Sequence, residues 1–198
     1  MFGWRSAIRL TQGRRSKPGV ERGGGADHPR HASQQTFARS MGRGFETMTS
    51  ALDTNVIVAG LLTWHEHHRS AAAAIEAAIA STSPVLVPIP ALLEAWSVMT
   101  RLPSPYRLAH QAAGELLHRT FRGQRRLVGL GEHEAWQLMD RLEQGGRIGK
   151  LTYDAQILMC AAAGGADELY TFNRRDFDRL TGFGVAIVDP RERFPLFS

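Results

Sequence analysis

Four acidic residues of this 198-residue chain lie beside the ends of apolar segments. They are Asp53, Glu94, Asp154 and Asp176, separated by 41, 60 and 22 residues. Carboxylates brought together repel one another, and their pKa values rise unless a cation neutralises them. Sites built from oxygen ligands alone favour hard cations such as Mg²⁺ or Mn²⁺ over Zn²⁺. If the fold gathers these acids, the sequence predicts a divalent metal site.

The segments that would position the acids alternate between strands and helices. Asp53 follows an apolar run that predicts a buried strand, so it should lie at the carboxyl end of a central strand. In open α/β sheets that edge is where ligands bind. We predict strands over 50–53, 85–87, 126–129, 168–171 and 185–188, and helices over 54–62, 67–80, 90–101, 107–121, 132–144, 153–163 and 175–180. This alternation is typical of a parallel sheet covered on both faces.

Apolar spacing supports the predicted helices and places two of the acids on them. One apolar stripe at positions i, i+3, i+4 and i+7 comprises Ala135, Leu138, Met139 and Leu142. A helix that begins at Tyr153 would put Asp154 at the head of the stripe facing the sheet. Glu94 has apolar neighbours on both sides, so we expect it among mostly buried positions, where an acid is rare unless paired or metal-bound.

Three of the four acids also have a structural explanation. Asp53 could be the N-cap of the following helix, and Asp154 could be a first-turn partner of its helix dipole. Asp176 could cap or begin the short helix at 175–180. A nucleophilic role for Asp53, as in haloacid-dehalogenase-like phosphotransferases, would need a second Asp where this chain has Asn55. The case for a site therefore rests on the four acids together.

The order and spacing of these motifs resemble those of the PIN-domain ribonucleases, and most closely the VapC-type toxins of bacterial toxin–antitoxin pairs. The family pattern is an Asp after the first strand, a Glu on the helix after the second, an Asp opening a late helix, and a T-x-[N/D]-x-x-D-F segment after the fourth strand. Here the last segment is Thr171 to Phe177, and the resemblance covers about Met48 to Pro190. It implies a three-layer α/β fold with a central parallel sheet of four to five strands flanked by helices.

The resemblance also implies the site. It assigns catalysis and metal binding to the acidic quartet, with Thr54 and Asn173 beside it. Many family members carry Asp at the position of Asn173, which leaves open whether Asn173 or Asp176 completes the site. The implied activity is hydrolysis of RNA phosphodiester bonds by a Mg²⁺- or Mn²⁺-dependent endoribonuclease, with one or two ions. The implied partners are RNA, a cognate antitoxin and a second copy of the chain, in the cytoplasm. The alternative is a non-catalytic RNA- or partner-binding module that has kept the fold.

Positive charge is concentrated in residues 1–47, which carry nine Arg or Lys against three acids, whereas the rest of the chain carries 15 basic and 16 acidic residues. This segment is rich in Gly, Ser and Arg and has no apolar period, so we expect it to be disordered. It is either an RNA-contacting arm or lies upstream of a true start at Met41 or Met48. The nuclease domain is expected over 48–198, without a membrane-spanning segment.

A cysteine and three histidines complete the candidates. Cys160 lies in an apolar helical stretch and is the single cysteine, which suits core packing in a reducing compartment. His65, His67 and His68 form a cluster that could bind zinc with a fourth ligand. We expect an exposed loop instead, with His68 near substrate or partner.

Overall fold

The computed structural model describes residues 48–123, 126–146 and 149–195. The predictions for residues 1–47, including the disordered arm and the start at Met41, lie outside the described residues. No helix within the described ranges is both long enough and apolar enough to cross a bilayer.

A five-stranded parallel sheet forms the centre of the fold, as predicted. Its order is β3-β2-β1-β4-β5, and every neighbouring pair is parallel. The strands are β1 (Ser50–Leu52), β2 (Leu86–Pro88), β3 (Arg126–Val128), β4 (Glu168–Tyr170) and β5 (Ala186–Val188). All residues of β1, β2 and β4 are buried. Burial on both faces is expected for the central strands of a parallel sheet, and it explains their continuous apolar runs.

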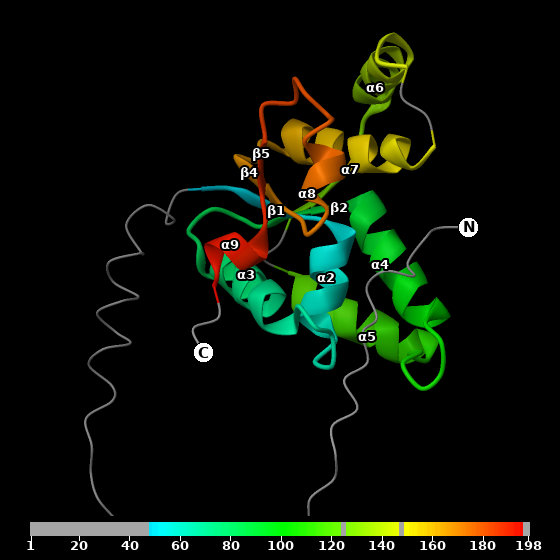
Figure 1. Cartoon of the computed structure of the whole chain (residues 1–198), viewed down its shortest axis with the longest axis vertical. Coiled ribbons are helices and arrows are strands. Elements are labelled where there is room, and N and C mark those ends of the chain that lie inside the picture. The colour runs from blue at the N-terminus through cyan, green and yellow to red at the C-terminus, as the bar shows by residue number, and fades with distance from the viewer. Residues whose placement is uncertain (1–47, 124–125, 147–148, 196–198) are drawn as a thin grey trace, which may run out of the picture. The chain divides into compact units, whose positions relative to one another are not determined.

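Helices cover both sides of this sheet, with α7 and α8 on one side and α2, α3 and α9 on the other (Figure 1). The helices are α2 (Thr54–Leu61), α3 (His68–Ala80), α4 (Ile89–Arg101), α5 (His110–Phe121), α6 (Glu132–Gln144), α7 (Lys150–Gly164), α8 (Arg174–Phe177) and α9 (Pro190–Arg193). The three-layer α/β architecture is therefore confirmed. The chain enters α2, α4 and α8 directly or within a few residues of β1, β2 and β4, so the candidate residues follow the carboxyl ends of these strands.

Helix α7 differs from its prediction in a way that matters for the site. It begins at Lys150 rather than at residue 153, so Asp154 lies in its second turn and cannot be a first-turn dipole partner. The helix packs closely on the sheet: a Cβ at Gly164 would lie 2.8 Å from the Leu86 side chain and 2.9 Å from that of Val128. Glycine at this position lets α7 approach β2 and β3.

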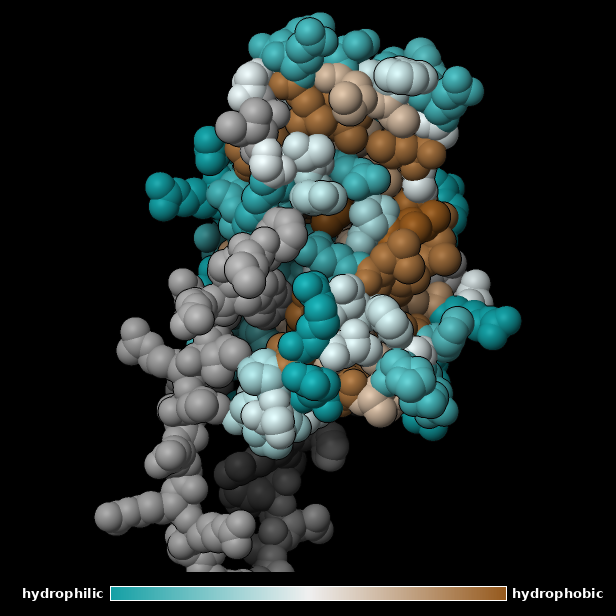
Figure 2. All heavy atoms as spheres, turned by 90° about the vertical axis from the view of Figure 1, so that its right-hand side faces the viewer, coloured by the Kyte–Doolittle hydropathy of each residue, from teal (hydrophilic) through white to brown (hydrophobic). Residues whose placement is uncertain are grey.

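Helix α6 buries less of its apolar stripe than the spacing predicts. Leu138 and Leu142 are buried, whereas Met139 is exposed, and so is Trp136 on the same helix. Figure 1 shows α6 beyond α7. Besides α7, the segment after α8 contacts this helix, since Arg141 donates to the Gly182 carbonyl at 2.9 Å and its guanidinium lies over the Phe183 ring. Figure 2 looks onto this side of the molecule and shows separate hydrophobic patches divided by hydrophilic surface.

The structure adds a helix that the sequence analysis missed. Helix α9 follows β5 immediately, with Asp189 as its N-cap accepting from the backbone N–H of Arg191 and with Pro190 in its first turn. Both are standard signals of a helix start. With four residues, α9 is too short to show an apolar period, and spacing could not have revealed it.

Candidate metal-binding site

Asp53 lies at the end of β1, beside Thr171 at the end of the neighbouring β4. The pairing of Leu52 with Tyr170 places these next residues side by side. The Asp53 carboxylate is buried; Oδ2 accepts a hydrogen bond from the Thr171 hydroxyl at 2.7 Å, and Oδ1 accepts one from the backbone N–H of Thr54 at 2.7 Å. Asp53 is also the N-cap of α2. The capping interpretation and the site interpretation of this residue are thus both compatible with its geometry.

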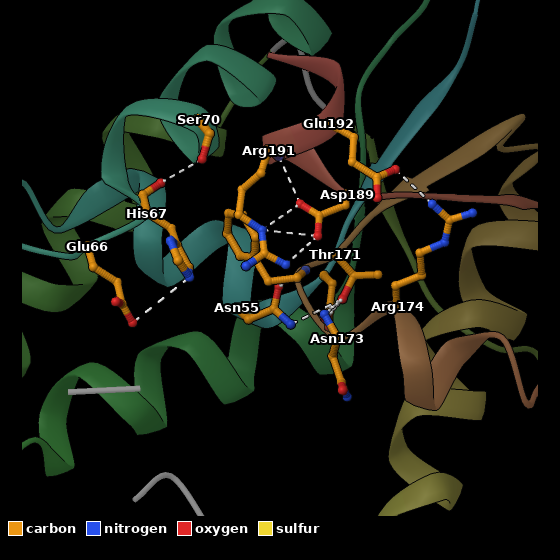
Figure 3. Close-up of polar contacts among 12 residues, drawn as sticks. Asn55, Glu66, His67, Ser70, Thr171, Asn173, Arg174, Asp189, Arg191 and Glu192 are labelled. Atoms are coloured by element: carbon orange, nitrogen blue, oxygen red, sulfur yellow. Dashed lines mark hydrogen bonds and ion pairs between the residues drawn. The ribbon is translucent and has the colours of Figure 1, made fainter. Parts of the chain in front are cut away.

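Thr171 is the centre of a hydrogen-bond network that the sequence analysis did not assign to the site. Its hydroxyl oxygen accepts from the Asn55 side-chain amide at 3.1 Å and from the backbone N–H of Asn173 at 3.0 Å, while its proton goes to Asp53. The Asn55 carbonyl in turn accepts from the N–H of Phe172 at 3.1 Å. Figure 3 shows the Asn55 side chain directed toward Thr171 from α2, whereas the side chain of Asn173, in the segment after β4, points away from Thr171. The sequence contained a signal for this role, because Thr171 is the first residue of the T-x-[N/D]-x-x-D-F segment.

Lys150, at the start of α7, connects two of the predicted acids. Its ammonium lies 2.7 Å from Oδ2 of Asp176 and 3.9 Å from Oδ2 of Asp154. The same Asp176 oxygen accepts from the Asn173 side-chain amide at 2.8 Å. Asn173 and Asp176, the alternatives for completing the site, are therefore hydrogen-bonded to each other. Lys150 was missed, although its spacing of four residues from Asp154 places both on one helix face.

Glu94 reaches the cluster from α4. Four residues of this helix are buried, Ala91, Ala95, Val98 and Met99, but Glu94 itself is exposed, so the expectation of a buried acid was wrong. Its neighbour Leu93 is 63% exposed and Trp96 is 42% exposed. This face of α4 is apolar in sequence yet open in the structure, which residue spacing cannot distinguish from a buried face. Glu94 Oε2 accepts from the Thr54 hydroxyl at 2.8 Å, and this bond links it to the residue that follows Asp53.

Burial and mutual repulsion perturb the two inner carboxylates. Burial raises the pKa of Asp53 from 3.8 to about 7, with further upward contributions from the charges of Asp154 and Glu94; the hydrogen bonds from Thr171 and Thr54 oppose the shift. Burial likewise raises the pKa of Asp154 to about 6; Lys150 opposes the shift, while Asp176 and Glu94 add to it. The four predicted acids are thus electrostatically coupled.

Asp176 behaves differently from Asp53 and Asp154. The hydrogen bond from Lys150, followed by that from Asn173, lowers the pKa of Asp176. Burial lowers the pKa of Lys150, but its hydrogen bond to Asp176 and the charges of Asp154, Asp176 and Asp53 raise it by more. Lys150 and Asp176 therefore form a close ion pair at the edge of the acidic cluster, and the same ammonium lies 3.9 Å from Asp154 Oδ2.

These residues fit a divalent cation in their chemistry. Within the described part of the chain, Asp154 Oδ2 is buried and has no hydrogen-bond partner, an arrangement that is costly for a carboxylate. A cation bound between Asp154 and Asp53 would relieve this cost and the repulsion between them. Across the described ranges no three Asp, Glu, His or Cys side chains already stand close enough to hold an ion.

The histidines and the cysteine do not form a competing centre in the described residues. The His68 ring contacts the Ala59 carbonyl at 3.1 Å and His65 Nδ1 accepts from the N–H of His67. The His67 ring packs on Phe172 with 4.8 Å between centroids, so His67, rather than His68, lies next to the network around Thr171. Cys160 is buried, and burial raises its thiol pKa to about 11, as expected for a residue of the core.

Comparison with known proteins agrees with this geometry. The model of the PIN domain family matches residues 51–182, a range that includes all four acids. Ribonuclease VapC40 of Mycobacterium tuberculosis (strain CDC 1551 / Oshkosh) is 34% identical over 120 residues, which are 59% of this chain and 81% of that protein. The chain is thus similar to a ribonuclease over most of that ribonuclease's length.

Solved structures show the same fold at lower identity. VapC20 of Mycobacterium tuberculosis, described as a sarcin-ricin loop cleaving toxin, aligns with a TM-score of 0.53 and 17% identity, covering 66% of this chain and 94% of that one. VapBC2 from Rickettsia felis aligns with a TM-score of 0.51 and 20% identity, covering 72% and 98%. Because the family model spans more than half of the chain and a VapC ribonuclease is 34% identical to it over 120 residues, this chain belongs to the PIN-domain family, among the VapC-type ribonucleases.

Proposed function

We propose that this chain is a divalent-metal-dependent endoribonuclease that hydrolyses RNA phosphodiester bonds, and that it is the toxin of a toxin–antitoxin pair. The observation that carries the proposal is the pair of inner carboxylates, Asp53 and Asp154. Both are buried, both have raised pKa values, and Asp154 Oδ2 has no hydrogen-bond partner among the described residues. Such a pair is stabilised by a bound cation. The family match, the similarity to Ribonuclease VapC40 and the fold support the activity.

Each residue of the site has a proposed role. Asp53 and Asp154 would hold the ion, whose chemistry would be to polarise the phosphate and to make a nearby water molecule more acidic. The Thr171 hydroxyl and the N–H of Thr54 fix both oxygens of Asp53, so this ligand keeps its orientation. Glu94 is exposed and oriented by the Thr54 hydroxyl, so it can reach an ion or a water molecule from the solvent side.

Asp176 and Asn173 complete the proposed acidic quartet and its surroundings. Asp176 adds negative charge next to Asp154, while the neutral Asn173 amide holds Asp176 in place at 2.8 Å. We further propose Mg²⁺, or Mn²⁺ in its place, as the ion. All the acids supply oxygen, and the family's general need for a divalent metal does not itself specify which one.

The proposed partners are RNA, a cognate antitoxin and a second copy of the chain. VapBC2 from Rickettsia felis and VapBC-1 from nontypeable Haemophilus influenzae have the same fold. Exposed Leu93 and Trp96 flank Glu94 on α4 and offer apolar area beside the acids. A guanidinium from an antitoxin could pair with two carboxylates there and compete with the metal.

A cleavage assay with one matched pair of variants tests the activity. Purified chain is incubated with a panel of hairpin RNAs in EDTA and after addition of Mg²⁺ or Mn²⁺. Asp154→Asn removes a metal-binding charge at constant volume and should lower cleavage at least about 100-fold, because changes to outer-shell residues of metal sites already cost 10–100-fold. Asp178→Asn, an exposed acid at the C-cap of α8, is the control and should keep full activity.

Two results would contradict this proposal. Cleavage that persists in EDTA would refute metal dependence, and full activity of Asp154→Asn would refute the site. Tight RNA binding without cleavage under every metal condition would instead support the alternative, a non-catalytic RNA-binding module with the same fold.

A further inference from the structure

The ammonium of Lys150 stands where a second cation would have to bind. It is 2.7 Å from Oδ2 of Asp176 and 3.9 Å from Oδ2 of Asp154. The Asn173 amide donates to the same oxygen of Asp176 at 2.8 Å. A carboxylate oxygen has two lone pairs, so these two N–H donors occupy the acceptor capacity of that oxygen.

The position of Lys150 on its helix is otherwise unfavourable. It is the first residue of α7, and a positive charge near a helix N-terminus is opposed by the helix dipole. No acidic residue lies in the first turn of α7 to compensate. The carboxylates of Asp154, one turn further along, and of Asp176, on α8, are what hold the ammonium there. The side chain of Lys150 is about half exposed, so packing does not force it into this position.

The two sides of the acidic cluster are therefore unequal. On one side, Asp176 already has a cationic partner in Lys150 and a second donor in Asn173. On the other side, Asp154 Oδ2 has no hydrogen-bond partner in the described residues and lies 3.9 Å from the Lys150 ammonium, and Asp53 has only neutral donors. A buried carboxylate without a directly hydrogen-bonded counter-charge is stabilised more by a new cation than one that already has such a partner.

We propose that Lys150 is a built-in counter-charge that fills the Asp176 side of the site, so that the chain binds one divalent ion, between Asp53 and Asp154, rather than two. The inference rests on the proposed metal-dependent function and specifies how this chain carries it out. Lys150 acts as a positioning residue. It keeps Asp176 ionised and in place, and it repels a second ion from the carboxylate that such an ion would need.

The lowered pKa of Asp176 and the raised pKa of Lys150 agree with a stable ion pair. A divalent ion coordinated by Asp176 would need an oxygen at about 2.1 Å, in direct competition with an ammonium already 2.7 Å from Oδ2. The two cations would also repel each other at close range. Removing the ammonium charge should therefore open this position to a second ion.

Direct counting of bound ions tests the proposal without relying on activity. Mn²⁺ binding to the purified full chain is followed by electron paramagnetic resonance of the free ion. Lys150→Met removes the charge and keeps the length, Lys150→Arg keeps the charge, and Arg119→Met removes an exposed positive charge from α5, which contributes no residue to the site. The Asp53→Asn/Asp154→Asn double variant supplies the background of surface binding. Thermal melts verify that each variant is folded.

We expect one ion per chain for the wild type, Lys150→Arg and Arg119→Met, and two for Lys150→Met. The first ion should also bind Lys150→Met at least about tenfold more tightly than the wild type. The substitution removes the repulsion between the ammonium and the divalent ion, which is of this size even when water screens it. Two ions in the wild type, or a single ion in Lys150→Met, would overturn the proposal. A wild type that cleaves RNA with Mg²⁺ and binds two ions defeats only the Lys150 proposal, whereas one that binds no ion defeats the proposed function as well.

Discussion

The raised pKa of Asp53 makes the stability of the metal-free protein depend on pH in an unusual direction. Most carboxylates in folded proteins are easier to ionise than in the unfolded chain, so acid destabilises the fold. Asp53 is the reverse: burial raises its pKa from 3.8 to about 7. Between these values the folded chain binds more protons than the unfolded chain. The contribution of Asp53 to the free energy of unfolding therefore falls as pH rises through this window, whereas His65, whose pKa is lowered mainly by burial, contributes in the opposite direction.

The size of the effect follows from the shift. One pKa unit corresponds to about 1.4 kcal/mol, so a shift of roughly three units amounts to about 4 kcal/mol once the pH exceeds both values. About 3 kcal/mol of this loss falls between pH 5 and pH 8. Asp154, whose pKa rises to about 6, adds a smaller loss in the same direction. For a domain with a typical stability of 5–15 kcal/mol, these losses are a large fraction of the total.

The substitution Asp53→Asn isolates the contribution of this residue. It removes the titration but disturbs a hydrogen bond, because the Thr171 hydroxyl oxygen already accepts from Asn55 and Asn173 and cannot readily accept a third donor from an amide. That disturbance should cost about 1–3 kcal/mol at every pH. The variant should consequently be less stable than the wild type at pH 5 and at least as stable at pH 8, with the two stability curves crossing between these values.

Urea denaturation in EDTA at intervals from pH 5 to pH 8 measures these curves. Asp178→Asn, at an exposed position, should follow the wild type throughout. Saturating Mg²⁺ should flatten or reverse the wild-type slope, since the ion binds the ionised carboxylates of the folded chain. A difference in stability between the wild type and Asp53→Asn that stays constant from pH 5 to pH 8 without metal would refute the assignment of Asp53 as a buried acid with a raised pKa, because this difference cancels the opposite contribution of His65.

Three further predictions concern the network and the surface. Thr171→Val should lower the free energy of unfolding by at least about 2 kcal/mol, because three hydrogen-bonding groups lose their partner, while Thr171→Ser should retain most of the stability in the same urea assay. Glu94→Gln should weaken both growth arrest and antitoxin binding, measured by colony counts and calorimetry, because it removes an exposed charge; unchanged values in both would exclude Glu94 from the site. Residues 48–198 expressed alone should arrest growth as the full chain does, and the neighbouring antitoxin should relieve the arrest. A harmless truncated chain would show that residues 1–47 contribute to RNA binding.

Much of the architecture was predictable because it depends on short-range patterns. Buried apolar runs such as Leu86 to Pro88 and helical spacing along α3 and α7 are local properties of the chain. They predicted all five strands and every helix except α9, with boundaries within a few residues. The alternation of strands and helices then implied a parallel sheet, since parallel neighbours require crossover connections. Two features were not predictable from local pattern. Helix α9 has only four residues, and the burial of the apolar stripe on α6, whose bounds were predicted, depends on which elements pack against it.

The sequence by itself indicated which acids could form a site: Asp53 and Asp176 come after strands whose carboxyl ends lie at one edge of a parallel sheet, and Asp154 precedes an apolar helical stretch. Which of these acids is ionised easily and which has a charged partner depends on the tertiary structure. Burial and neighbouring charges, which depend on residues up to 118 positions apart, leave Asp53 hydrogen-bonded by neutral groups and give Asp176 a cationic partner in Lys150. The pKa of a carboxyl group depends on its surroundings rather than on its place in the chain. For that reason the sequence could name the acids, and the tertiary structure was needed to show which of them lack a counter-charge.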